Sequence, residues 1–248
     1  MENARESKSP LDIGYYKQVG KELPNNDQYR KLIGMLLYVS TNTRPDIAAS
    51  VAILSKKVEK PRDNDFNELK RIIRYLKGTR NLKLKLSVSN QISDVIAFSD
   101  ANWAEDKTDR KSNSGFCIFL NGGLISWCCR KQDIIALSSA ESEFVAITET
   151  CKELMWIKSV IQELNVSQKT PITVMTDSQS CIALIENQKF SNRSKHIDTK
   201  YHFFRDHVVN KKISLKYVSS GENVADLMTK PLGPLKLKYH RSNIGLME

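Results

Sequence analysis

The sequence predicts an α/β protein in which a small helical unit precedes a mixed β-sheet flanked by helices. Two observations support this class. Apolar residues recur at helical spacing through residues 28–82, and beyond that segment short β-prone runs alternate with helical ones. The later elements follow in the order strand, strand pair, helix, strand, two helices, strand and helix. Such an order is typical of a mixed sheet with helices packed on it.

The first part of the chain divides into an arm and a helical segment. Residues 1–27 are polar and contain two prolines, so we expect a linker or flexible arm there. Residues 28–82 contain three helical stretches, and the last, DNDFNELKRIIRYLKGTR, has an apolar stripe on one face. The opposite face of this last helix carries the basic residues Lys70, Arg71 and Arg74.

Strand signals begin near residue 82. The run LKLKLSV at 82–88 alternates between polar and apolar residues, and DVIAFSD at 94–100 has the apolar character of a buried strand. Residues 115–129 predict a β-hairpin, because the pair Asn121-Gly122 supplies the positive φ angles of a tight turn.

Helical and strand patterns then alternate to the end of the sheet domain, which we place at residues 83–235. They comprise a long helix at 138–164, a strand at 171–177 followed at once by a helix, a basic helix at 195–211, a strand at 213–219 and a last helix opening at 223–230. Residues 236–248 are expected to form a C-terminal tail.

Composition narrows the functional class. The 248 residues are 40% hydrophobic and 27% charged, as in an ordinary globular protein, and the apolar runs are too short to span a bilayer. The N-terminus lacks the apolar core of a secretory signal, so we expect a cytoplasmic or nuclear protein without a membrane partner. Five cysteines without a C-x-x-C pair indicate reduced thiols and give no support to a zinc knuckle.

The net charge of +10 is unevenly distributed. One basic cluster lies at residues 70–85 and a second region of positive charge extends from 186 to 241. Clustered basic residues suggest a polyanionic partner, most simply nucleic acid, and Lys195 and Arg205 are further candidates for phosphate contacts. The alternative is a solvated lysine-rich surface.

Four carboxylates stand at junctions between predicted elements: Asp100, Glu141, Asp177 and Asp226. Packing of their helices on a sheet with both aspartate strands central would bring the four together. Each has a second interpretation except Asp100, which has no helix to cap. Glu141 could complete a capping box with Ser138, Asp177 could cap the following helix, and Asp226 could be a helix-start charge favoured by the dipole.

A cluster of carboxylates also predicts a cation, because like charges repel unless one is present. Oxygen ligands with open positions suit Mg²⁺, for which Mn²⁺ could substitute. Two such ions can activate a water and stabilise a leaving oxygen in phosphodiester hydrolysis. The four residues are therefore candidate metal ligands and catalytic groups.

Several motifs resemble a known family. SDANWA, SSAESEF, TDSQS, KHIDTKYHFFRD and NVADLMTKPL resemble the ribonuclease H domain of copia-type LTR retrotransposon Pol polyproteins, and LKRIIRYLKGT resembles the distal reverse transcriptase segment, thumb or connection, just upstream. The resemblance implies a ribonuclease H-like sheet with strand order 3-2-1-4-5. It also implies cleavage of the RNA strand of an RNA–DNA hybrid, with the Asp-Glu-Asp-Asp roles on Asp100, Glu141, Asp177 and Asp226.

The sequence departs from the family pattern in the loop SSGENVAD, which lacks the mobile histidine of many ribonucleases H. No Tyr-x-Asp-Asp motif of a polymerase palm occurs, so we expect no DNA synthesis. Two alternatives to a metal-dependent ribonuclease stay open. One is a nucleic-acid-binding module that derives from a retrotransposon and has lost turnover; the other is a subdomain that supports other parts of a Pol polyprotein.

Overall fold

The computed structural model describes residues 4–86, 94–166, 168, 170–186 and 198–248. The chain divides into two compact units, one formed by Met1–Lys85 with Lys230–Glu248 and the other by Leu86–Thr229.

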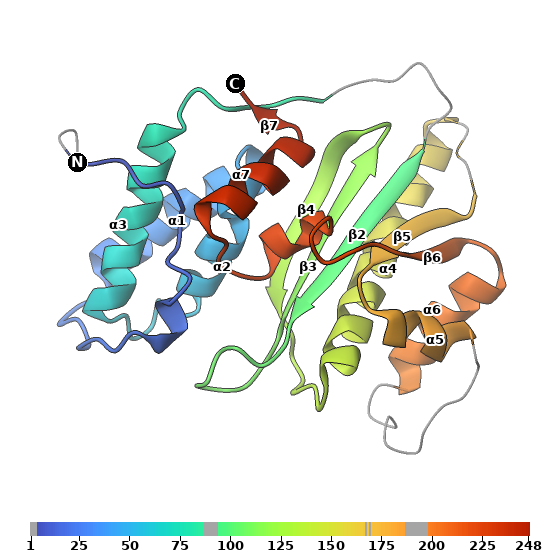
Figure 1. The fold of residues 1–248 in the computed structure, drawn as a ribbon, viewed down its shortest axis with the longest axis horizontal. Coiled ribbons are helices and arrows are strands. Elements are labelled where there is room, and N and C mark those ends of the chain that lie inside the picture. The colour runs from blue at the N-terminus through green and yellow to red at the C-terminus, as the bar shows by residue number, and fades with distance from the viewer. Residues whose placement is uncertain (1–3, 87–93, 167, 169, 187–197) are drawn as a thin grey trace. The chain divides into compact units, whose positions relative to one another are not determined.

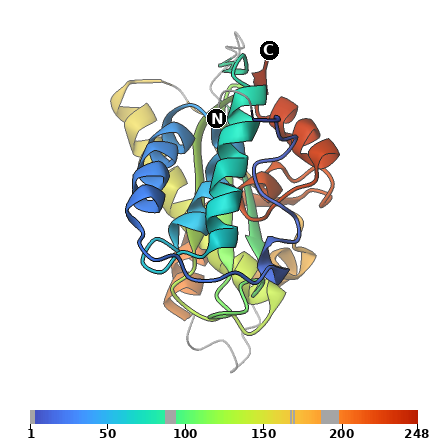
Figure 2. The same cartoon turned by 90° about the vertical axis from the view of Figure 1, so that its left-hand side faces the viewer.

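The first unit is helical. Its elements are η1 (Tyr15–Lys17), α1 (Asp27–Asn42), η2 (Pro45–Ile47), α2 (Ala48–Ser55), α3 (Asp63–Gly78), β1 (Lys83–Leu84), α7 (Pro234–Asn243) and β7 (Leu246–Met247) (Figures 1 and 2). Helices α1 and α3 each bury one apolar stripe, and the short apolar helix α2 is buried on most of its surface. Ile33, Leu54 and Ile72, one from each helix, are almost inaccessible to solvent. This confirms the helical pattern of residues 28–82.

Both ends of the chain belong to this unit, which differs from the predicted arm and tail. In the N-terminal segment Leu11 is fully buried, and the hydroxyl of Tyr15 donates a 2.7 Å hydrogen bond to Asp65 of α3. In the C-terminal segment Leu237 of α7 is buried, and β7 pairs antiparallel with β1. The apolar residues that anchor these segments are too few and too widely spaced to form a periodic pattern, so the sequence does not reveal them.

The second unit is built on a five-stranded sheet in the order β4-β3-β2-β5-β6. The strands are β2 (Val95–Asn102), β3 (Asn113–Leu120), β4 (Gly123–Lys131), β5 (Ile172–Thr176) and β6 (Ile213–Tyr217). Strands β2, β3 and β4 are antiparallel neighbours, whereas β5 runs parallel to both β2 and β6 (Figure 1). Counted along the chain from β2, this is the order 3-2-1-4-5 that the resemblance implies.

The structure confirms the predicted hairpin but contains only a short part of the first predicted strand. Asn121 and Gly122 both have positive φ angles, which confirms the tight turn between β3 and β4. The predicted strand at 82–88 is reduced to β1, which lies in the first unit, and part of that prediction lies outside the described residues.

Helices cover one face of the sheet and enclose its core. They are α4 (Ser139–Glu163), α5 (Gln179–Glu186) and α6 (Asp198–Val209) (Figure 1). Val174 from the sheet and Phe144, Ile147 and Leu154 from α4 are buried in one hydrophobic cluster. The last element, predicted as a helix from 223, is the short 3₁₀ helix η4 (Val224–Met228), which packs on β2 and β3.

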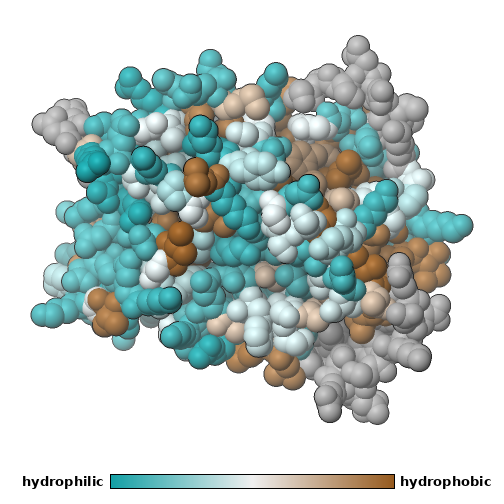
Figure 3. Space-filling view, viewed as in Figure 1, coloured by the Kyte–Doolittle hydropathy of each residue, from teal (hydrophilic) through white to brown (hydrophobic). Residues whose placement is uncertain are grey.

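The surface face shown in Figure 3 is mainly hydrophilic, with apolar side chains scattered among polar ones. No helix among the described residues has the length and hydropathy needed to cross a bilayer.

Candidate metal centre

Two aspartates meet where the parallel strands β2 and β5 end. Phe98 of β2 lies opposite Met175 of β5, so Asp100 and Asp177, each two residues further along, stand at the same level of the sheet. Side chains alternate along a strand, and both carboxylates therefore project on the same side as Phe98 and Met175. Asp100 is 2% exposed and Asp177 is partly buried.

A glutamate from α4 completes a set of three carboxylates. Oxygen atoms of Asp100, Glu143 and Asp177 all lie within 4.8 Å of one another. Three ionised groups at this separation repel one another strongly, and a divalent cation between them would remove that cost. The donor set contains oxygen only, which is what Mg²⁺ and Mn²⁺ prefer. The side chains therefore fit the predicted metal.

The position of Glu143 follows from the way α4 packs on β2. The hydroxyl of Thr150 donates a 3.1 Å hydrogen bond to Ser99, the residue that precedes Asp100. Glu143 lies two helical turns before Thr150 and one before buried Ile147, so the three side chains share the side of α4 that faces the sheet. Its Oε2 atom is shielded from solvent.

Glu141, the predicted ligand on this helix, is not in the set of carboxylates that the described residues form. Its carboxylate accepts a 2.8 Å hydrogen bond from the backbone N–H of Leu137, and its own N–H donates to the hydroxyl of Ser138 at 3.2 Å. Ser138 caps the helix through the N–H of Glu141, which is half of the predicted capping box, whereas the Glu141 carboxylate binds Leu137, the residue before the cap. Two residues advance a helix by about 200°, which explains why Glu143 faces the sheet when Glu141 does not.

Asp226 lies close to the set but outside it. It belongs to η4 and is 1% exposed. The side chain of Asn223, which caps η4, donates a 3.0 Å hydrogen bond to the carbonyl of Ser99 on β2. At the other end of η4 the hydroxyl of Thr229 donates to Asp100 Oδ2. These two contacts hold η4, and Asp226 with it, beside the strand that carries Asp100.

Gly115 makes this close approach possible. It pairs with Asp100 across β2 and β3. A Cβ atom at this position would lie 2.6 Å from Thr229 Cγ2 and 2.7 Å from Met228 Cβ, which is closer than real contacts allow. The sequence alone gives no reason to select Gly115 or Thr229, because both act through pairing between distant segments.

The loop before η4 also contacts the set. The hydroxyl of Ser220 donates a 2.6 Å hydrogen bond to Asp177 Oδ2. Ser220 stands in SSGENVAD, the loop without a histidine, and it shows that a polar side chain from this loop reaches the carboxylates.

The basic residues predicted to contact nucleic acid are only partly available on the surface. Arg71 forms ion pairs with Asp12 and Glu68 at 3.1 and 3.5 Å, and the Lys70 ammonium lies 4.3 Å from the centre of the Phe66 ring. Those two predicted contact residues therefore have structural partners within the first unit. The other predicted contact residues are Arg74, partly buried on α3, Arg205, partly buried on α6, and Lys195, which lies outside the described residues.

Comparison with known proteins places the chain among long polyproteins. It is 36% identical over 255 residues to the "Retrovirus-related Pol polyprotein from transposon TNT 1-94" of Nicotiana tabacum, which covers 99% of this chain and 19% of that protein. It is 35% identical over 229 residues to the corresponding polyprotein from transposon RE2 of Arabidopsis thaliana, covering 92% of this chain and 16% of that one. The chain thus spans less than a fifth of the length of these curated relatives.

The comparisons with family models and with solved structures show weaker similarity. No protein-family model matches the chain. Among solved structures, LC11-RNase H1 in complex with an RNA/DNA hybrid is 11% identical with a TM-score of 0.43, covering 55% of this chain and 94% of that one.

Proposed function

Because the chain belongs to the family of copia-type, retrovirus-related transposon Pol polyproteins, we propose that it is a ribonuclease H, a divalent-metal-dependent enzyme that cleaves the RNA strand of RNA–DNA hybrids. The observation that carries the proposal is the set formed by Asp100, Glu143 and Asp177 at the end of the central strands. The hybrid and other segments of a Pol polyprotein are the partners that this function implies.

In the proposed site the three carboxylates hold the metal, and Asp226 is a further ligand candidate from η4. When bound, Mg²⁺ would lower the pKa of a coordinated water and would add positive charge that stabilises the phosphodiester during cleavage. The chain orients the ligands. Thr229 fixes Asp100, Ser220 fixes Asp177, and the packing of α4 on β2 fixes the position of Glu143.

A labelled RNA–DNA hybrid tests this function directly. We expect the protein to cut the RNA strand in Mg²⁺ or Mn²⁺, to leave the DNA strand and duplex DNA intact, and to lose activity when EDTA is added. Cleavage that persists in EDTA would exclude the metal mechanism.

Asp177→Asn separates a metal ligand from a structural carboxylate. The hydroxyl of Ser178, not Asp177, accepts from the N–H of Cys181 at the start of α5. Asparagine can still accept the hydrogen bond from Ser220, so a purely structural residue would leave activity intact. A ligand would lose activity by orders of magnitude. The exposed Asp133 provides a control, because Asp133→Asn removes the same charge from a residue that is not in the set.

The rival function, a binding module without turnover, predicts a different result. Such a protein would bind the hybrid in a salt-dependent manner and would not cleave it in any divalent metal. The same purified protein therefore distinguishes the two functions.

A further inference from the structure

A chain of buried polar groups in the first unit fixes the side chain of Arg241. The guanidinium of Arg44 donates to both oxygens of Asp46 at 2.9 and 2.8 Å, and the hydroxyl of Tyr75 donates to Asp46 Oδ2 at 2.5 Å. Asp46 and Tyr75 are 2% and 1% exposed. Arg241, on α7, donates in turn from Nη1 to the Tyr75 oxygen at 3.2 Å.

The direction of these hydrogen bonds is well defined. Burial, followed by the charge of Asp46, raises the pKa of Tyr75 above its usual value, so the phenol keeps its proton and donates it to the carboxylate. The phenol oxygen then accepts from Arg241. The guanidinium is therefore held by one nitrogen, and its Nε atom makes no hydrogen bond to any described residue.

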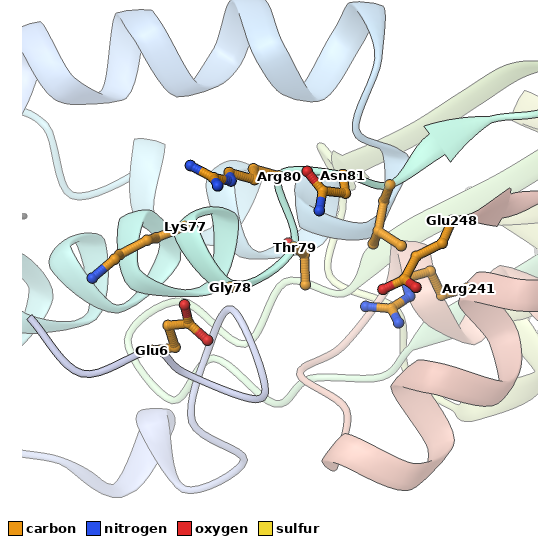
Figure 4. A pocket seen from close by; sticks show the side chains of 9 residues that line it. Glu6, Lys77, Gly78, Thr79, Arg80, Asn81, Arg241 and Glu248 are labelled. Carbon is orange, nitrogen blue, oxygen red and sulfur yellow. The ribbon is translucent and has the colours of Figure 1, made fainter.

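Arg241 lies in a groove between α7, the end of α3 and the N-terminal segment. Two adjoining pockets of about 400 and 980 Å³ form this groove, and Arg241, Lys77 and Thr79 line both of them. Figure 4 shows the smaller pocket, with Lys77 and Arg80 coming from the end of α3 and the segment after it, and Arg241 from α7. We call this feature the α3–α7 groove.

Positive charge dominates the α3–α7 groove. Its cationic lining residues come from three separate segments, and they are Arg5, Lys8, Lys77, Arg80, Lys238 and Arg241. Its acidic lining residues are Glu6 and Glu248. A groove with this excess attracts anions, and an arginine that is already held in place loses little entropy when its guanidinium contacts a phosphate.

We propose that the α3–α7 groove binds the phosphate backbone of a nucleic acid. A polyanion fits better than a single phosphate group because the cations are distributed along both pockets, with Arg80 lining the smaller one and Arg5, Lys8 and Lys238 the larger. Most of these side chains are exposed, as expected for contacts with a solvated backbone. The site lies in the helical unit and goes beyond the proposed cleavage activity.

Binding of a short labelled DNA duplex, measured by fluorescence anisotropy in EDTA over a range of salt concentrations, tests the proposal. In EDTA no metal-dependent cleavage takes place, so the measurement reports binding alone. The variant Arg80→Gln/Lys238→Gln removes two exposed cations from the groove. If both contact phosphates, the slope of log K against log salt should become shallower by about 1.8, since each contact contributes about 0.9.

A matched control removes the same two residue types from the same unit. Arg30→Gln/Lys31→Gln neutralises an exposed arginine and lysine on α1, neither of which lines the groove. We expect its slope to stay close to that of the wild type. Equal slopes for the groove variant and this control would overturn the proposal.

Further measurements test whether the ligand is a polyanion or a small phosphorylated molecule. They also test whether binding in the groove is separate from the metal site. Arg241→Lys keeps the charge but loses the fork, and we expect weaker binding at low salt with an intact melting transition. Equal affinity for a mononucleotide and for longer oligonucleotides would assign the groove to a small phosphorylated ligand and contradict the proposal. In the cleavage-deficient Asp100→Asn background, the difference in salt slope between the groove variant and its control should persist, and loss of that difference would contradict a groove that is independent of the metal site.

Discussion

The hydroxyl of Thr229 donates a hydrogen bond to Asp100 Oδ2, although the two residues are 129 positions apart in the chain. Both side chains are buried. The contact joins the end of η4 to the central strand β2, and it orients a carboxylate that would otherwise rotate within the candidate metal site. A hydrogen bond to a charged group is stronger than one between neutral groups, so this contact serves both stability and geometry.

Thr229→Val should weaken the metal site. Without the Thr229 hydroxyl, the buried carboxylate of Asp100 lacks a hydrogen-bond donor. In the absence of metal this should lower the free energy of unfolding by about 1–3 kcal/mol. Hybrid cleavage should require a higher Mg²⁺ concentration for half-maximal rate. Thr229→Ser keeps the hydroxyl and should restore the Mg²⁺ dependence. An unchanged Mg²⁺ titration in the valine variant would show that Thr229 only supports the fold.

The two glutamates at the start of α4 form a matched pair for mutation. Glu143→Gln should lower cleavage by orders of magnitude and reduce the rise in melting temperature that Mg²⁺ produces, because it removes a charged ligand. Glu141→Gln should remain active, since an amide oxygen can still accept from the N–H of Leu137. The measurements are hybrid cleavage rates and thermal melts with and without Mg²⁺. If Glu141→Gln lost cleavage activity and Glu143→Gln kept it, Glu141 would be the metal ligand.

Gly115→Ala should displace η4 from the sheet. The added methyl would meet Thr229 and Met228 at under 3 Å, and overpacking of this kind typically costs about 1–3 kcal/mol. Activity should fall because Asp226 and Thr229 move with η4. Gly123→Ala on β4 is the control, as its methyl would have no neighbour closer than 3.5 Å. Equal denaturant midpoints for the two variants would contradict this account of Gly115.

His207 on α6 should titrate below an ordinary histidine. Burial, followed by the nearby charge of Lys212, lowers the pKa of its imidazole, which packs edge-on against the Phe203 ring at 4.8 Å. The unfolded chain therefore binds more protons than the folded one between the folded pKa and the unfolded value of about 6.5. Stability should be lost as the pH falls through that interval. Histidine NMR resonances measure the midpoint, and His207→Gln should make the free energy of unfolding less dependent on pH there.

Asp46 should be essential for the stability of the helical unit. Its carboxylate accepts hydrogen bonds from Arg44 and Tyr75. Asp46→Ala removes one partner of a buried ion pair, which should lower the free energy of unfolding by about 3–5 kcal/mol. Tyr75→Phe removes one hydrogen bond and should cost about 0.5–1.5 kcal/mol. Asp27→Asn on the exposed start of α1 is a control with little expected effect. Urea unfolding followed by circular dichroism measures all three, and comparable midpoints for Asp46→Ala and the control would disprove the assigned role.

The sequence by itself determined the elements whose signal is local. The 3.6-residue periodicity of α3 and α4, the Asn-Gly turn between β3 and β4, and the apolar runs of β2 and β5 are properties of short segments. The positions of Asp100 and Asp177 at the ends of two such runs were visible for the same reason. Once the two strands pair in parallel, their shared register brings the carboxylates together.

Only the tertiary structure decided the features that depend on distant segments. Glu141 and Glu143 have the same chemistry, and the packing of α4 on β2 determines which of them faces Asp100. The N-terminal segment and α7 join the helical unit through a few anchoring contacts, such as Tyr15 with Asp65 and Arg241 with Tyr75. Gly115 and Thr229 acquire their roles when η4 docks on the sheet. In each case the deciding contact joins residues far apart in the chain, and a local pattern carries no information about such a contact.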